Sequence, residues 1–143
     1  MSSIFVVSSE NYDAIGSAIT GSISGNVSQA NGNPILSATV EIIRQDENGF
    51  WSVSTESDGS YAASDLPMGY YKVRAFKLGY AREYYDNVYY NSEATIIQLG
   101  ASGDVTGVDF NLDLGGSISG MVYDDETEAP IGNAQVWVSP CSS

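Results

Sequence analysis

Tyrosine is concentrated in one short stretch of the chain, where a binding surface could form. The stretch holds four tyrosines with a carboxylate and an amide between them: Tyr84, Tyr85, Asp86, Asn87, Tyr89 and Tyr90. Aromatic rings stack on the C–H faces of sugars, and planar polar groups hydrogen-bond the hydroxyls. The pattern predicts a surface for a glycan or a partner protein. The alternative interpretation is that the rings pack a long connection while their hydroxyl groups reach water.

Acidic residues gather in a second stretch, where Asp124 and Asp125 precede Glu126 and Glu128. Calcium takes about six to eight oxygen ligands from a loop that wraps it, and this stretch lacks the spacing, the glycine and the terminal glutamate of an EF-hand. We therefore expect a solvated acidic turn. Weak calcium binding by Asp124 and Asp125 is the alternative, and no other cofactor is expected.

Composition excludes several classes of function. Histidine is absent and Cys141 is the single cysteine, which removes a histidine base, histidine-ligated metals and an internal disulfide. Five basic and 18 acidic residues give a net charge of −13, so nucleic acid and anionic membranes are poor partners. No apolar run reaches the ~20 residues of a membrane-spanning helix. Carboxylate pairs could in principle hydrolyse glycosides, but no cleft-forming insertion is evident, and we expect no enzyme.

The chain contains an internal repeat. Residues 21–27 (GSISGNV) recur as residues 116–122 (GSISGMV), an offset of 116 − 21 = 95 residues, and the match continues through residue 138. This period is that of a whole domain, because solenoid units are only ~20–50 residues long. We expect an N-terminal arm or the trailing strand of a preceding element at 1–20, a complete domain at 21–115, and a partial second repeat of two strands at 116–143.

Within the complete copy, apolar and polar residues alternate with the period of half-buried strands, most clearly at residues 108–114. Turn signals separate the runs, including Asp58-Gly59, which predicts a tight hairpin between residues 51–55 and 60–63. Gly25, in mid-strand, predicts a close approach of a neighbouring chain or a bulge. The pattern predicts an all-β sandwich with this core: Ile23, Val27, Val40, Ile42, Val53, Tyr61, Leu66, Tyr71, Val73, Val108, Phe110 and Leu112.

The order of these signals resembles the carboxypeptidase regulatory-like domain family. The motifs that carry the resemblance are Gly25-x-Val27, NGNPI at 31–35, Ala38-x-Val40, Asp58-Gly59-x-Tyr61, Leu66-Pro67-x-Gly69-x-Tyr71 and Gly79-Tyr80. The resemblance covers residues 21–114 and recurs over 116–138. It implies an antiparallel, seven-stranded, transthyretin-like (prealbumin-like) sandwich, related to the Cna B-type repeats of bacterial surface proteins. Members of the family are mostly spacers, stalks and adhesion modules.

The related Cna B-type repeats often carry a Lys–Asn isopeptide bond that a buried glutamate catalyses. In this chain, residues 21–27 contain no lysine and Ala75 stands where the resemblance would place the glutamate. We therefore expect no such cross-link.

The partial repeat should form two strands, at 116–122 and 134–138, with an apolar face and no domain of their own to cover it. The candidate strand-pairing residues, including those of the N-terminal arm, are Ile4, Phe5, Val6, Val7, Ile118, Val122, Val136, Trp137 and Val138. A lone hairpin is marginally stable and a free strand edge pairs readily. If ordered, these strands should pair with this chain's own sheet, with the N-terminal arm, or with a neighbouring copy.

Taken together, the sequence predicts a non-enzymatic structural or adhesive module of an extracellular or cell-surface assembly, although no secretion signal is present in this chain. Its expected partners are neighbouring domains or copies of itself. One alternative is a self-assembling fibre or virion-type subunit, in a virion particle, whose terminal strands complete a neighbour's sheet. Another is a carbohydrate-binding module that uses the tyrosine cluster.

Overall fold

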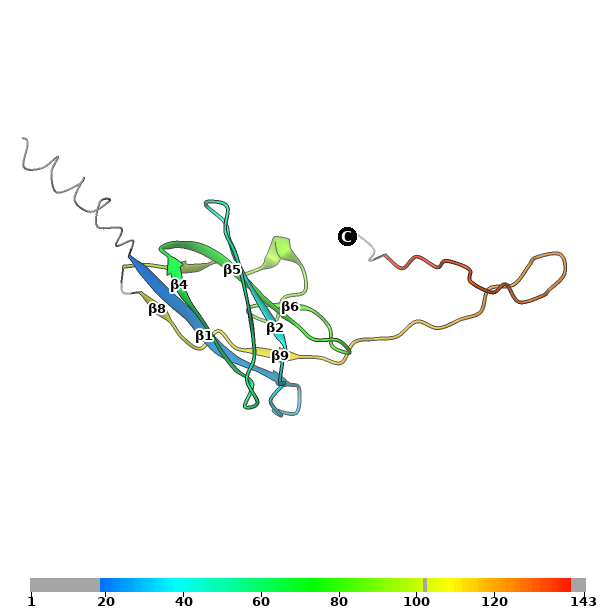
Figure 1. Ribbon diagram of the computed structural model, residues 1–143, viewed down its shortest axis with the longest axis horizontal. Coiled ribbons are helices and arrows are strands. Elements are labelled where there is room, and N and C mark those ends of the chain that lie inside the picture. The colour runs from blue at the N-terminus through cyan, green and yellow to red at the C-terminus, as the bar shows by residue number, and fades with distance from the viewer. Residues whose placement is uncertain (1–18, 102, 140–143) are drawn as a thin grey trace, which may run out of the picture.

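The computed structural model describes residues 19–101 and 103–139. In this part of the chain lie nine strands and one short 3-10 turn, so the all-β prediction is confirmed (Figure 1). The elements are β1 (Thr20–Gln29), β2 (Thr39–Arg44), β3 (Phe50–Ser54), β4 (Ser60–Pro67), β5 (Gly69–Phe76), β6 (Glu83–Tyr84), η1 (Asn91–Glu93), β7 (Ile97–Leu99), β8 (Asp104–Val105) and β9 (Phe110–Leu112).

The strands form two sheets that pack as a sandwich. In the first sheet, β4 pairs with one side of β1, and β8 and β9 follow one another along its other side. In the second, the order is β3-β2-β5, and β6 and β7 share the free side of β5. The nine segments thus occupy the seven strand positions that the family resemblance implies.

Two segments depart from antiparallel pairing, because β8 and β9 run parallel to β1. The preceding strand, β7, ends at Leu99 opposite Gly69, at the end of the sandwich where β1 begins. The chain crosses there from the second sheet to the first, so that its last strand must run in the same direction as β1 (Figure 1).

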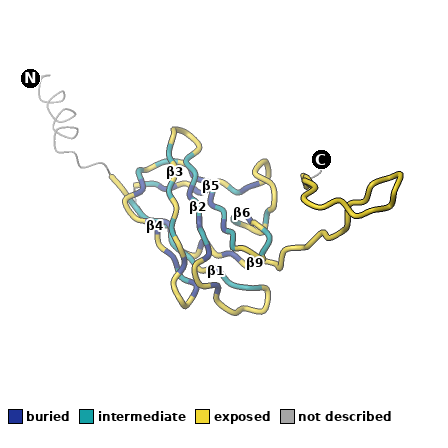
Figure 2. Tube along the Cα trace, turned by 45° about the vertical axis from the view of Figure 1, so that its right-hand side comes forward, coloured by how far each residue is buried: buried dark blue, intermediate teal, exposed yellow. Residues whose placement is uncertain are grey.

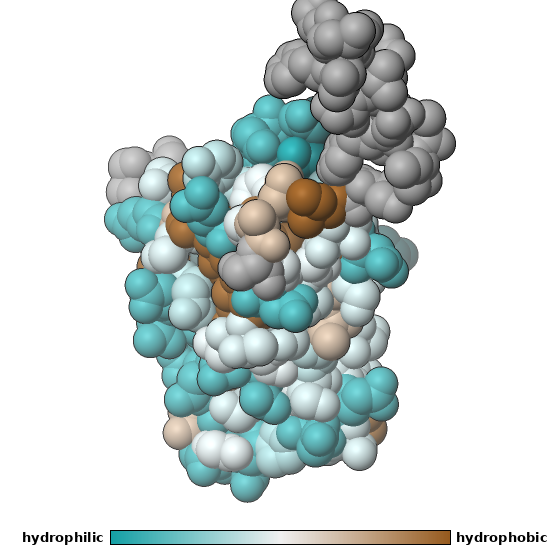
Figure 3. All heavy atoms as spheres, turned by 90° about the vertical axis from the view of Figure 1, so that its left-hand side faces the viewer, coloured by the Kyte–Doolittle hydropathy of each residue, from teal (hydrophilic) through white to brown (hydrophobic). Residues whose placement is uncertain are grey.

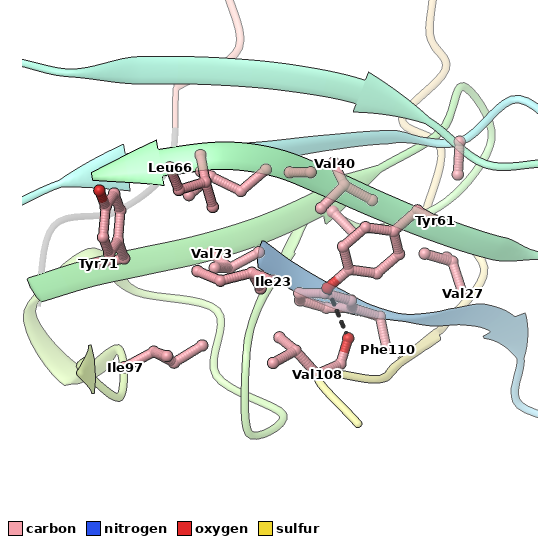
Figure 4. Packing of buried hydrophobic residues seen from close by; sticks show 14 of the residues in the cluster. Ile23, Val27, Val40, Tyr61, Leu66, Tyr71, Val73, Ile97, Val108 and Phe110 are labelled. Atoms are coloured by element: carbon pink, nitrogen blue, oxygen red, sulfur yellow. Dashed lines mark hydrogen bonds between the residues drawn. The ribbon is translucent and has the colours of Figure 1, made fainter. Parts of the chain in front are cut away.

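The core lies between the sheets (Figures 2 and 4). All but one of the predicted core residues are buried; the exception, Val53 on edge strand β3, is half-buried and packs against the others. The hydroxyl of Tyr61 donates a 2.7 Å hydrogen bond to the carbonyl oxygen of Val108, which links β4 to the segment before β9 (Figure 4). Burial raises the pKa of Tyr61, so its phenol stays a donor at every physiological pH.

The Asp58-Gly59 turn differs from its prediction. Gly59 has the expected positive φ of 79°, but the strands on either side do not form a hairpin. Instead β3 pairs with β2 and β4 pairs with β1, so the turn joins the two sheets. The physical reason is that β1, and not β3, pairs with the chain after the turn. The backbone N–H of Val27 in β1 donates a 2.8 Å hydrogen bond to the carbonyl of Gly59, which places β4 in the first sheet.

The two extra strands predicted for the partial repeat are not formed. Residues 116–139 contain one isolated bridge, between Tyr123 and Pro130, and otherwise no strand pairing. The segment leaves the sandwich beyond β9, and all of its residues are exposed (Figures 1 and 2). A two-stranded unit without a third strand or a covering layer buries too little apolar surface to order its backbone.

One prediction falls outside the described residues, because the arm residues Ile4, Phe5, Val6 and Val7 lie in 1–18. The single cysteine, Cys141, also lies outside them, in 140–143. Within the described part, no helix has the length and apolar character needed to cross a bilayer.

The predicted close approach at Gly25 is confirmed and gives a test of the first sheet. A Cβ at Gly25 would lie 2.1 Å from the carbonyl oxygen of Val108, whereas one at Gly116 would meet nothing within 4 Å. Gly25→Ala should therefore lower the free energy of unfolding by more than about 2 kcal/mol. Gly116→Ala, the matched control, should leave it within about 0.5 kcal/mol. Urea denaturation followed by tyrosine and tryptophan fluorescence measures both, and equal effects would contradict the packing described here.

Candidate functional site

The tyrosine cluster does not form one surface. Tyr84 is only 7% exposed, and Tyr85 packs against the core with its ring edge-on to Phe110, 6.4 Å between centroids. Tyr89 and Tyr90 are 49% and 52% exposed. The first two rings therefore hold β6 in place, and only Tyr89 and Tyr90 remain open to a ligand.

Tyr84 is held on the outer face of the second sheet by Arg74. The Arg74 guanidinium donates a 3.1 Å hydrogen bond to the Tyr84 hydroxyl and lies 5.8 Å from the centre of its ring. The same guanidinium forms an ion pair with Glu41 of β2. This cluster ties β2, β5 and β6 together, which explains why an aromatic residue at this position need not serve a ligand.

Asp86 and Asn87 shape the turn after β6. Both have positive φ, 79° and 58°, a region that Asp and Asn adopt more readily than other non-glycine residues. The carboxylate of Asp86 accepts a 3.2 Å hydrogen bond from the hydroxyl of Thr95. Carbohydrate binding by this loop stays a prediction, now carried by Tyr89 and Tyr90.

Glu83 is a buried carboxyl that the sequence reasoning missed. It pairs with Ala75 on β5, faces the core and is 2% exposed. Its Oε1 has no hydrogen-bond partner among the described residues. Burial raises the pKa of Glu83, the nearby carboxylate of Asp113 raises it further, and the backbone N–H of Asn111 opposes the shift. Nothing in the local pattern marks this glutamate as internal, because β6 is too short to show alternation.

Each of the two lysines donates to a backbone carbonyl, and the expectation that no lysine cross-link forms stays a prediction. Lys72 donates a 2.7 Å hydrogen bond to the carbonyl of Asn91, and Lys77 donates one of 3.0 Å to the carbonyl of Ser37. These are the only two lysines in the chain.

The chain is tethered where it leaves the sandwich. The N–H of Ala81 donates to the carbonyl of Asp113 at 2.8 Å, and the N–H of Gly115 donates to the carbonyl of Gly79 at 2.9 Å. Tyr80 and Leu114 form a bridge between these two bonds. The domain therefore holds its own chain up to the residue immediately before Gly116, where the repeat begins.

We call this end of the sandwich the exit end and the opposite one, where β1 begins, the leading end. Two shallow hollows adjoin Tyr80 at the exit end. Beside them Leu78 is 97% exposed and Leu114 is 77% exposed. Large apolar side chains that are this open, on a tethered surface, mark a region suited to contact with another molecule or domain.

The segment after the tether exposes what would be a core face. Ile118, Val122, Val136 and Val138 are 82%, 39%, 70% and 69% exposed, and Trp137 is 87% exposed. By the repeat, the first four correspond to residues of β1 and β2 that are each 0% exposed in the complete copy: Ile23, Val27, Val40 and Ile42. The same residue types are thus buried in one copy and open in the other.

The acidic turn is satisfied by its own chain. The Oδ1 of Asp124 accepts hydrogen bonds from the backbone N–H groups of Glu126 and Thr127, at 3.0 and 2.8 Å, and from the Thr127 hydroxyl at 2.9 Å. These donors hold the pKa of Asp124 below its usual value. In the described part of the chain, no three His, Cys, Asp or Glu side chains gather as a metal site would need. Calcium binding by Asp124 and Asp125 stays an untested prediction.

The comparisons with known proteins identify the fold family. The sequence profile of the carboxypeptidase regulatory-like domain matches residues 22–113, more than half of the chain. The chain belongs to the carboxypeptidase regulatory-like domain family. The resemblance noted from the motifs is thereby confirmed, with almost the same boundaries. No curated protein matches the sequence.

Several solved structures resemble this carboxypeptidase regulatory-like domain at low identity. They include the major pilin subunit of Bacillus cereus (14% identity, TM-score 0.49, covering 65% of this chain and 30% of that one). The pilus 2b backbone protein of group B streptococcus matches with 17% identity and a TM-score of 0.46 over 67% of this chain and 42% of that one. Catechol 1,2-dioxygenase of Acinetobacter radioresistens matches with 14% identity and a TM-score of 0.43 over 72% and 54%. This chain thus spans about half or less of each, and none of these likenesses assigns it an activity or a partner.

The buried carboxyl of Glu83 predicts a specific pH dependence. Because its pKa is raised in the folded state from the ordinary 4.5, the folded protein binds this proton more tightly than the unfolded chain does. The free energy of unfolding should therefore rise as the pH falls from the raised pKa of Glu83 towards 4.5. Glu83→Gln should remove this contribution, so that the variant is the more stable protein at neutral pH and the advantage shrinks in acid.

Urea denaturation between neutral pH and the ordinary carboxyl range measures this difference. Glu56→Gln is the matched control, because Glu56 is an exposed glutamate on the turn before β4. A stability difference between the parent and Glu83→Gln that does not change with pH would show that the carboxyl is not desolvated.

Proposed function

We propose that the domain is a non-enzymatic structural repeat of a tandem array, in which residues 116–138 begin the next copy. The observation that carries the proposal is the exposed face of Ile118, Val122, Val136 and Val138, whose counterparts form a fully buried core in the complete copy. A face of this kind is stable only when further strands cover it. In the array, the remaining strands of the second copy, equivalent to β4, β5 and β9, would supply that cover.

The geometry of the sandwich supports an end-to-end array. The chain begins β1 at the leading end and leaves from Leu114 at the exit end, so that a following copy continues away from the first (Figure 1). Successive copies would extend the protein in one direction instead of folding back on it. Such an arrangement suits a spacer or stalk.

We further propose that the array works outside the cell or on its surface, as a rigid or adhesive element whose partners are copies of the same domain. The net charge of −13 supports this role, because strongly acidic modules stay soluble and repel non-specific contacts. Exposed side chains such as Tyr89 and Tyr90 would make the adhesive contacts.

A second candidate uses the same exposed face between separate chains. The strands of 116–138 would then complete the sheet of a neighbouring molecule, as in a self-assembling fibre. The two candidates differ in concentration dependence. A tandem repeat folds within one chain, whereas strand donation between chains produces filaments that grow with protein concentration and are seen by sedimentation or light scattering.

Completing the second copy tests the proposed function. In the variant, residues 43–115 are appended after Val138, the counterpart of Ile42, which supplies strands equivalent to β3 through β9. We expect the calorimetric enthalpy of unfolding to increase about twofold, because enthalpy scales with the number of folded residues. The same extended chain with Val136→Asp is the control and should show one folded domain only. An unchanged enthalpy in the extended parent would contradict the proposal.

A further inference from the structure

The exit end combines exposed apolar side chains with positive charge. Lys77 and Arg82, two of only five basic residues in a chain of net charge −13, flank the fully exposed Leu78. The Arg82 guanidinium lies 5.0 Å from the centre of the Phe76 ring, and the Lys77 ammonium group binds the carbonyl of Ser37. Both cations are therefore held in place beside the hollow that they line with Leu78.

Two acidic residues of the exit end accept hydrogen bonds within the domain. The carboxylate of Asp113 accepts a 2.7 Å hydrogen bond from the hydroxyl of Tyr89. Asp58 accepts hydrogen bonds from the N–H and hydroxyl of Ser60, on the turn that packs against Pro34. Glu56 lies on that same turn. The hollow beside Leu78 is lined by Lys77 and Arg82 and by no acidic side chain, so a partner seated there meets cations and apolar carbon.

The leading end has the opposite character. Four acidic residues lie on or next to its connections: Asp46, Glu47, Asp65 and Asp104. Arg44 is the one basic residue beside them. Arg44 pairs with Asp46 and Glu47 at 2.9 and 3.0 Å, which leaves the end acidic overall. Met68 and Ile19 are 37% and 42% exposed there. Viewed from this side, hydrophilic side chains surround a few strongly hydrophobic ones (Figure 3).

The internal repeat would place Leu114 at the junction between the exit end of one copy and the leading end of the next. Leu114 lies 95 positions after Ile19, so both occupy the position two residues before the repeated GSISG motif. Because the tether holds the chain up to Gly115, only Gly116 is free to act as a hinge, and a Cβ there would meet nothing within 4 Å. A following copy would therefore be joined to the first without a linker segment that could separate the two domains.

From these observations, and resting on the tandem array proposed above, we propose that the exit end docks directly onto the leading end of the next copy. Leu78 would be covered by the next copy's counterpart of Met68, Leu114 would lie at the junction between the two copies, and Lys77 and Arg82 would face the acidic residues of that end. The contact is heterologous, because different surfaces meet, so it continues from copy to copy without closing. The array would then be a rod with fixed joints instead of independently moving domains.

The extended chain, with residues 43–115 appended after Val138, tests this contact. Its second copy carries the counterparts of Asp46, Glu47 and Met68. Nitrogen-15 relaxation should show one common rotational diffusion for both domains. Lys77→Glu with Arg82→Glu in the first copy should abolish it, and each domain should then tumble on its own. Leu78→Ser should loosen the joint without changing the charge.

Charge reversal on both sides gives the decisive comparison. Replacing the second copy's counterparts of Asp46 and Glu47 by lysine should restore common tumbling in the Lys77→Glu, Arg82→Glu variant, because attraction is re-formed with the signs exchanged. Lys72→Glu, a single charge reversal on the outer face of β5, is the control and should have no effect.

The outcomes separate this inference from the proposed function. If the second copy folds but both domains tumble independently, the docking is wrong and the tandem array stands. If the second copy does not fold, the array proposal fails. Docking is then judged on the unextended chain, whose chemical shifts at both ends should change with concentration at low salt. The absence of that change, or its persistence in Lys77→Glu with Arg82→Glu, would overturn the inference.

Discussion

The strand β1 is the element on which the structure depends, because it is paired along both sides and, at Gly21 and Gly25, neighbouring backbone lies where a side chain would stand. A Cβ at Gly21 would lie 1.4 Å from the carbonyl oxygen of Gly103, and one at Gly25 would lie 2.1 Å from that of Val108. These close approaches allow β8 and β9 to run beside β1. The strand β9 begins two residues after Val108 and ends at Leu112, two residues before Leu114 forms its bridge with Tyr80.

The fold could be predicted from the sequence where local pattern and tertiary packing agree. Alternation of apolar residues identified the core, and Gly25 marked the close approach of another strand. Pattern alone could not show which strands pair. The turn at Asp58-Gly59 therefore joins two sheets instead of making a hairpin, because β4, which follows the turn, pairs with β1 and not with β3.

The site was harder to predict because its residues act through neighbours distant in sequence. Tyr84 and Tyr89 belong to the same aromatic stretch, yet Arg74 holds the first against the sheet and the second stays half exposed beside Asp113. Glu83 is buried beside β5 and β9, of which β9 is distant from it in sequence, and no local periodicity reveals this burial. The strands of the partial repeat were predicted from the same kind of pattern. Such a pattern predicts an apolar face, but it does not identify the element that packs against that face.

The central claim is that residues 116–138 are the uncovered beginning of a second copy while the first copy is complete. Amide hydrogen exchange on the full chain, read peptide by peptide, tests it most directly. We expect strong protection over β1 and β2 and exchange at the rate of unstructured chain over their counterparts in 116–138. Strong protection of those counterparts in a monomeric sample would contradict it, since the strands would then have a partner within the same chain.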